Sequence, residues 1–177
     1  MGHPSQILIH LTRQILILSG KYPVDGHSLI TTQKGWRMKV FTDEITIAAD
    51  PDTIWATLID GARYPTWNPE VVKVDGAFAR GVTLTMYRNK EPRRSPVTVA
   101  EFQPGQKLVL TSSGGMPSSL VKAKHTFTLT PAGGSGTRVA QRLEFGGMMA
   151  ATLGRSIPDQ SAAMREVNEA LKAVVEA

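Results

Sequence analysis

The stretch from Phe41 to Pro69, FTDEITIAADPDTIWATLIDGARYPTWNP, contains the features that decide the fold. Its first residues alternate between apolar and polar, which is typical of a strand with one buried face. Asp50 and Pro51 predict a helix start, because aspartate can accept bonds from free backbone amides and proline fits the first helical position. Apolar residues at helical spacing follow as far as Asp60, and the two prolines of 61–69 exclude another long element. This stretch therefore predicts a strand, a short helix and a turn.

The rest of the chain predicts a series of strands and one long helix. Short apolar segments separated by glycine-containing turns predict six antiparallel strands at about 70–79, 82–90, 96–103, 107–113, 119–130 and 136–145. The final segment, 148–176, has apolar residues at helical spacing, and Pro158 either kinks this helix or starts its main part. A long amphipathic helix must bury its apolar stripe, and one face of a curved sheet provides the surface. The sequence thus predicts an α+β fold.

This order of elements resembles the START-like (SRPBCC) superfamily, and within it the bacterial polyketide cyclase/dehydrase-like branch. The resemblance rests on the Ile45–Trp55 opening, the Tyr64–Pro69 turn, and the segment Phe145–Met149 before the final helix. It covers 38–177 and none of 1–37. It implies a helix-grip fold, in which a seven-stranded antiparallel sheet wraps around the C-terminal helix. It also implies an internal cavity for lipids, polyketides or other apolar ligands.

The first 37 residues are expected to be an extension outside the core fold, with the helix-grip domain at 38–177. The apolar run at 6–18 is interrupted by polar residues and is shorter than the roughly 20 residues that a membrane span requires. It also lacks the charged start of a secretory signal. We expect a cytoplasmic protein without stable membrane insertion, although the run could form a helix that packs on a neighbour.

Composition argues against nucleic-acid binding and against a metal site. The formal net charge is +5, but 1–37 hold four basic residues and one acid, which leaves 16 basic and 14 acidic residues in the domain. A nucleic-acid partner requires a concentrated basic face. Cysteine is absent, and three of the four histidines lie in the extension. We expect no metal, no cofactor and no nucleic acid, and a monomer or homodimer.

The alternation in 119–130 places a histidine on the apolar face of a strand. His125 shares this face with Phe127, and a ring facing the cavity could orient a ligand carbonyl or carry a proton near neutral pH. The alternative is a core histidine that bonds to a neighbouring group. In the last strand Gln141 and Leu143 share the inward face, and Met164 belongs to the apolar stripe of the final helix.

Two charged residues and a tryptophan complete the candidate site. Arg88 lies two residues after Met86, so the alternation of the strand points its side chain inward at the mouth of the expected cavity, where it could bind an oxyanion. The alternative is that the side chain extends into solvent at the end of the strand. Glu101 continues the inward phase of its strand and could be the ion partner of Arg88. Trp67 lines the entrance or covers the core.

Three functions remain open on these residues. The preferred one is binding of a small hydrophobic ligand, either lipid, polyketide or aromatic-like, by Trp67, Met86, Arg88, His125, Phe127, Gln141, Leu143 and Met164. The second is a cyclase or dehydratase reaction on a polyketide-like carbonyl compound, with His125, Arg88 or Glu101 transferring protons. The third is a groove for a protein or membrane partner. No serine lies in a nucleophile-elbow sequence, so the residues favour binding over catalysis.

Overall fold

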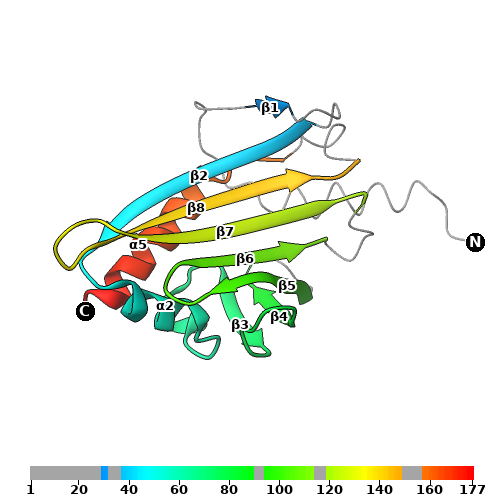
Figure 1. Ribbon diagram of the computed structural model, residues 1–177. Helices are drawn as coiled ribbons and strands as arrows, with labels where there is room; N and C mark the ends of the chain where they lie inside the picture. The colour runs from blue at the N-terminus through cyan, green and yellow to red at the C-terminus, as the bar shows by residue number, and fades with distance from the viewer. Residues whose placement is uncertain (1–28, 32–36, 90–93, 114–118, 149–156) are drawn as a thin grey trace, which may run out of the picture.

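The computed structural model of the chain describes residues 29–31, 37–89, 94–113, 119–148 and 157–177. Its elements form one antiparallel sheet of order β1-β2-β8-β7-β6-β5-β4-β3 and a set of helices on one side of it (Figure 1). The strands are β1 (Leu29–Thr31), β2 (Arg37–Ile47), β3 (Val71–Asp75), β4 (Thr83–Arg88), β5 (Arg94–Gln103), β6 (Lys107–Ser112), β7 (Lys122–Pro131) and β8 (Thr137–Gly146). The helices are α2 (Pro51–Ile59), α3 (Tyr64–Trp67) and α5 (Ser161–Val175).

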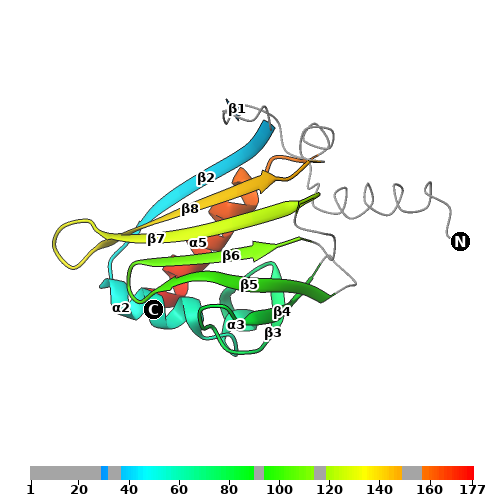
Figure 2. The ribbon, with the colours of Figure 1, turned by 45° about the vertical axis from the view of Figure 1, so that its right-hand side comes forward.

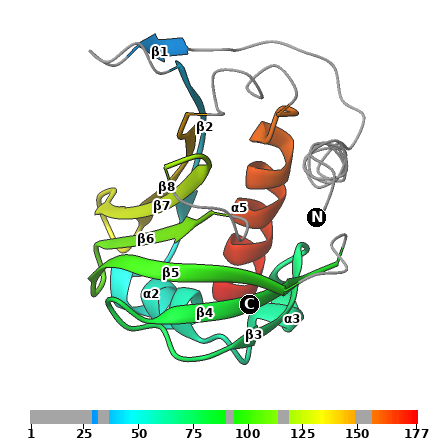
Figure 3. The same ribbon diagram turned by 90° about the vertical axis from the view of Figure 1, so that its right-hand side faces the viewer.

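The seven strands β2 to β8 confirm the predicted sheet. The expected α+β helix-grip architecture is also confirmed, because α5 crosses the concave side of this curved sheet (Figures 2 and 3). The extension contributes one more strand at the edge, since β1 pairs with the start of β2 through Leu29 and Lys39. No helix within the described ranges is long and apolar enough to span a membrane.

The start of α2 follows the predicted capping pattern. The Asp50 side chain accepts bonds from the backbone N–H groups of Asp52 and Thr53, both at 3.0 Å. Two free amides of the first turn are thereby satisfied, and Pro51 occupies a position where no donor is needed. Ile54 and Leu58 of this helix are fully buried. The capped helix packs against α5 and against β7.

The long C-terminal helix begins later than the sequence predicted. Residues 157–160 are not helical, and α5 starts at Ser161, three residues after Pro158; 149–156 lie outside the described residues. Pro158 therefore precedes the helix and does not kink it. The buried residues of α5 are Met164, Val167, Asn168 and Leu171, which form a stripe along one side. The last turn is joined to the end of β2, where the Glu176 carboxylate accepts from the backbone N–H of Ala48 at 2.7 Å.

The inward side chains of the sheet form two apolar clusters. The large cluster lies toward α2 and includes Ile47, Leu108, Val139 and Leu171, each with no exposed surface. The small cluster lies at the other end of β2 and β8 and consists of Phe41, Ile157 and Met164, with Leu143 and Phe145 packed against them. We call these two regions the packed end and the polar end, because a row of polar side chains adjoins the small cluster.

Candidate functional site

His125 lies on the inward face of β7 and bonds to a glutamine on the neighbouring strand. Its Nε2 is 2.8 Å from Oε1 of Gln141, a residue of β8 that is 1 % exposed. The His125 ring also lies 4.4 Å from the Phe127 ring, measured between centroids. His125 is therefore bonded to a buried neighbour, as the alternative interpretation of the sequence had it, but part of its surface remains accessible.

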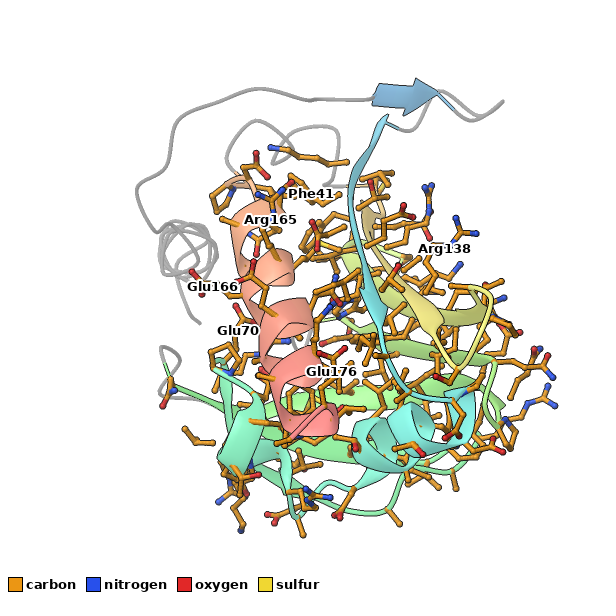
Figure 4. The ribbon with its side chains drawn as sticks, turned by 90° about the vertical axis from the view of Figure 1, so that its left-hand side faces the viewer. Phe41, Glu70, Arg138, Arg165, Glu166 and Glu176 are labelled. Atoms are coloured by element: carbon orange, nitrogen blue, oxygen red, sulfur yellow. The ribbon has the colours of Figure 1, made fainter. Side chains whose placement is uncertain are left out.

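The hydrogen bonds continue from Gln141 through α5 to a carboxylate on β2. Gln141 Nε2 donates to Asn168 Oδ1 at 2.6 Å, and Asn168 Nδ2 donates to Asp43 Oδ2 at 2.7 Å. Asn168 has no exposed surface, whereas the Asp43 side chain is 12 % exposed and lies 3.6 Å from Nε of Arg165. We call His125, Gln141, Asn168 and Asp43 the polar chain. It runs from the interior at β7 to the surface beside α5, where Arg165 lies near the end that carries Phe41 (Figure 4).

Strand register explains why these residues meet. Asp43 of β2 and Gln141 of β8 are direct cross-strand partners, so their side chains leave the sheet side by side. His125 is paired with Leu143, two residues further along β8, and its ring reaches Gln141 diagonally. Asn168 follows Met164 by four positions on the buried stripe of α5, directly above the Asp43–Gln141 row. One residue from each of four elements therefore converges at this point.

The polar chain separates the two apolar clusters. The Asp43–Gln141 row lies between the Phe41–Leu143 row of the polar end and the Ile45–Val139 row of the packed end. A buried polar group without partners costs about 1–3 kcal/mol, so such a layer is tolerated only when its members bond to one another. The bonds described above meet this condition for the two buried amides.

The environment of His125 keeps the ring neutral. Burial lowers the pKa of His125 from 6.5 to about 4, the hydrogen bond to Gln141 opposes this shift, and the positive charge of Arg88 adds to it. At neutral pH the ring then carries one proton. Arg88 therefore lies close enough to His125 for its charge to act on the pKa of the ring.

The ion partners of the two charged candidates differ from the prediction. Arg88 pairs with Glu70, with 3.5 Å between Nη1 and Oε2, whereas Glu101 pairs with Lys107 at 2.9 Å. The cause is a β-bulge in β5 between Val99 and Glu101, which shifts the alternation by one residue. Phe102 now turns inward, where its ring contacts Trp55, and Glu101 joins the outer face. The expectation that Glu101 shares the inward face with Arg88 is therefore wrong.

Three of the remaining candidates belong to the large cluster. Trp67, Met86 and Phe127 are all at least nine-tenths buried. Trp67 packs on Tyr64, with ring centroids 5.0 Å apart, and its buried Nε1 has no acceptor among the described residues. A buried N–H without an acceptor is costly, which makes Trp67 a candidate donor to a bound molecule. Met164 and Leu143, by contrast, belong to the small cluster.

Two further features lie apart from this site. A surface hollow of about 550 Å³ is bordered by the start of α2, the β5–β6 turn and the end of β7, including Pro51, Gly105 and Leu129. It is at the packed end, four residues along β7 from His125, and is distinct from the predicted interior cavity. No group of three or more potential metal ligands occurs in the described part of the chain.

Asp43, Asn168 and Glu70 were not among the predicted site residues. Asp43 stands in the buried phase of its strand between Phe41 and Ile45, and Asn168 lies on the helical stripe of Met164 and Leu171. A polar residue at an apolar position was the available signal for both. Nothing in the local sequence distinguishes Glu70 as the partner of Arg88.

Comparison with known proteins identifies the family and the fold. The family described as "Polyketide cyclase / dehydrase and lipid transport" matches residues 38–176. No curated protein matches the chain. Among solved structures, norcoclaurine synthase from Thalictrum flavum, in complex with dopamine and hydroxybenzaldehyde, has a TM-score of 0.63 at 17% identity, covering 89% of this chain and 97% of that one.

Two bacterial structures show the same fold. A protein from Mesorhizobium loti has a TM-score of 0.60 at 21% identity, covering 77% of this chain and 96% of its own. A START superfamily protein from Mycobacterium smegmatis has a TM-score of 0.57 at 19% identity, covering 77% of this chain and 97% of its own. At these identities the likeness concerns the fold alone.

Proposed function

The chain belongs to the polyketide cyclase/dehydrase and lipid transport family, and we propose that it binds a small hydrophobic molecule between the sheet and α5. The molecule is a lipid, a polyketide or an aromatic-like compound. The observation that carries the proposal is the state of His125. Its ring is surrounded deeply enough to lower its pKa to about 4, yet part of its surface is accessible. These two properties together support our proposal that His125 borders an internal space.

The side chains around His125 support an apolar lining for this space. Ala123, Leu143 and Phe145 share the inward face with His125 at the polar end, and all three retain accessible surface. At the packed end, the inward residues of the same two strands, β7 and β8, are buried. Ligand sites are typically apolar with a few polar groups that fix orientation. Here His125 and Arg88 are such groups, and Trp67 Nε1 offers a further donor.

The family name and one similarly folded protein agree with a ligand of this kind. The norcoclaurine synthase structure contains dopamine and hydroxybenzaldehyde, which are small aromatic molecules. We propose an aromatic or similarly compact apolar ligand for this chain as well. We also propose that the protein is cytoplasmic and acts as a monomer or homodimer, without a nucleic-acid partner.

Catalysis is the weaker alternative for this site. A general base works best when its pKa is near the operating pH. Burial holds the pKa of His125 at about 4, so the ring is a poor proton acceptor at neutral pH. Glu101 bonds to Lys107 on the outer face and is removed from the catalytic candidates. A cyclase or dehydratase reaction would then depend on Arg88 and His125 alone.

A filled-cavity variant tests the binding proposal. Ala123→Phe adds a ring to the accessible inward face, whereas Ala140→Phe adds the same ring to the outer face of β8, where Ala140 pairs with Thr128 and Glu44. We expect N-phenyl-1-naphthylamine fluorescence to show binding to the unaltered protein and to Ala140→Phe, with at least tenfold weaker binding to Ala123→Phe. Equal binding to both folded variants would place the probe elsewhere and contradict the proposal.

A further inference from the structure

We infer that the polar chain makes His125 a hydrogen-bond acceptor toward the cavity, so that the site selects an apolar ligand bearing a hydroxyl or amine donor. This inference rests on the proposed binding function and specifies its ligand. It assigns Asp43, Asn168 and Gln141 the role of positioning residues, which act on the ligand through His125.

The Asp43 carboxylate determines the orientation of the Asn168 amide. A carboxylate only accepts, so the atom of Asn168 that lies 2.7 Å from Asp43 Oδ2 must be the amide nitrogen. Arg165 Nε lies 3.6 Å from the other oxygen of this carboxylate, Oδ1. The carbonyl oxygen of Asn168 is then turned toward Gln141, and it also can only accept.

A backbone carbonyl of α5 helps to determine the orientation of the Gln141 amide. Gln141 Nε2 donates to Asn168 Oδ1 at 2.6 Å and also lies 3.4 Å from the carbonyl oxygen of Met164. Both neighbours are acceptors, so the amide of Gln141 cannot be reversed without placing oxygen against oxygen. Its Oε1 therefore faces His125 as an acceptor.

The hydrogen bonds of the polar chain determine which tautomer His125 adopts. Since Gln141 Oε1 accepts, Nε2 of the neutral ring must carry the hydrogen, and Nδ1 keeps a free lone pair. No described residue donates to Nδ1. The sequence suggested that His125 could orient a ligand carbonyl, which would require a free N–H. The geometry reverses this expectation, because that N–H is already used by Gln141.

The ligand must then provide the donor. A phenol, an enol or an alcohol can place its O–H on Nδ1, whereas the corresponding ether or ketone places a lone pair against a lone pair. One such hydrogen bond changes affinity by about 1 kcal/mol, or roughly fivefold. Shape and apolar contacts select the body of the ligand, and His125 selects for its polar group.

The tautomer can be measured without any ligand. Long-range ¹⁵N–¹H correlation spectra of the full chain distinguish a protonated from an unprotonated ring nitrogen, and the His125 signals are identified by their loss in His125→Gln. We expect the Nε2–H form in the unaltered protein. Asp43→Asn removes the obligate acceptor, so a measurable Nδ1–H population should appear. Arg165→Gln leaves the carboxylate in place and should keep the Nε2–H form.

Ligand preference is tested with a matched pair of probes. We expect 2-naphthol to bind roughly fivefold more tightly than 2-methoxynaphthalene, which has nearly the same shape without the donor. The preference should disappear in His125→Leu, decrease in Asp43→Asn and persist in Arg165→Gln.

Each outcome bears on one part of the inference. An Nδ1–H form in the unaltered protein would overturn the tautomer assignment. Equal affinity for the two naphthalenes would overturn the donor preference while leaving the cavity intact. If neither naphthalene binds, the binding proposal itself fails and the donor preference fails with it. The tautomer assignment is then still decided by the ligand-free spectrum.

Discussion

The packed end and the polar end are built from the same strands and the same helix, but they are filled in different ways. At the packed end, Leu108, Val139 and Leu171 leave no accessible surface. At the polar end the inward residues of β7 and β8 are Ala123, Leu143 and Phe145, which remain partly accessible, and a bonded polar row adjoins them. The difference supports our proposal that one end stabilises the fold and the other binds the ligand.

The polar row is also the physical boundary between the two ends. Asn168 interrupts the apolar stripe of α5 at the level where Asp43 and Gln141 interrupt the inward faces of β2 and β8. A continuous apolar interior would tend to close by dispersion contacts along its whole length. A rigid set of hydrogen bonds holds α5 in place on the sheet by directed contacts instead. We therefore propose that the polar chain supports an accessible space and orients His125 toward it.

The largest effect should come from deleting packed side chains. Leu108→Ala removes a fully buried leucine of the packed end, and we expect the free energy of unfolding to fall by about 3–4 kcal/mol. Leu143→Ala makes the same change at a partly accessible position of the polar end and should cost about 1–2 kcal/mol. Urea denaturation of both variants gives the comparison. Equal losses would show that the two ends are equally packed.

A smaller effect, confined to the polar end, should appear on acidification. The pKa of His125 is about 4 in the folded chain and 6.5 when unperturbed, so between these values the unfolded state binds more protons. The free energy of unfolding should then decrease as the pH falls from about 6.5 to about 4. The loss is at most about 3 kcal/mol, and smaller to the extent that the ring is solvated.

His125→Leu provides the control for this pH dependence. The variant loses the titrating ring, so its stability should vary less between pH 6.5 and 4 than that of the unaltered protein. Denaturation at several pH values measures both curves. If the two curves are parallel, other groups cause the acid sensitivity and the assignment to His125 is wrong.

Local pattern was sufficient to predict the fold and the inward placement of some candidate residues. Alternation placed His125 and Gln141 inward, and helical spacing placed Met164 on the buried stripe, as the structure confirms. The bonds among them could not be predicted, because they depend on register between β2, β7 and β8 and on the height of α5 above the sheet. The same signal that singled out His125, a polar residue in an apolar phase, was present at Asp43 and Asn168.

Glu101 shows where alternation alone fails. Val97 and Val99 set the phase correctly, but the bulge that follows adds one residue and reverses the faces. No residue near Ala100 has a backbone preference that requires a bulge. The inward turn of Phe102 onto Trp55 is a tertiary contact with α2, which explains why the sequence of β5 alone gave the wrong face.

The smallest effect should come from removing the N-terminal extension, which reaches the sheet at the polar end. The three residues of β1 pair with Arg37–Lys39, at the outer edge of β2, while β2 is paired along its other side with β8. A chain that begins at Met38 loses only Arg37 of β2 and keeps β3 to β8 and all of α5. We expect its melting temperature, from circular dichroism, to lie within about 4 °C of the full chain, a shift that corresponds to about 1 kcal/mol. Binding of 2-naphthol should also be retained, since none of the polar chain is removed. A larger loss of stability, or a loss of binding at unchanged stability, would show that the extension completes the polar end and is not an appendage.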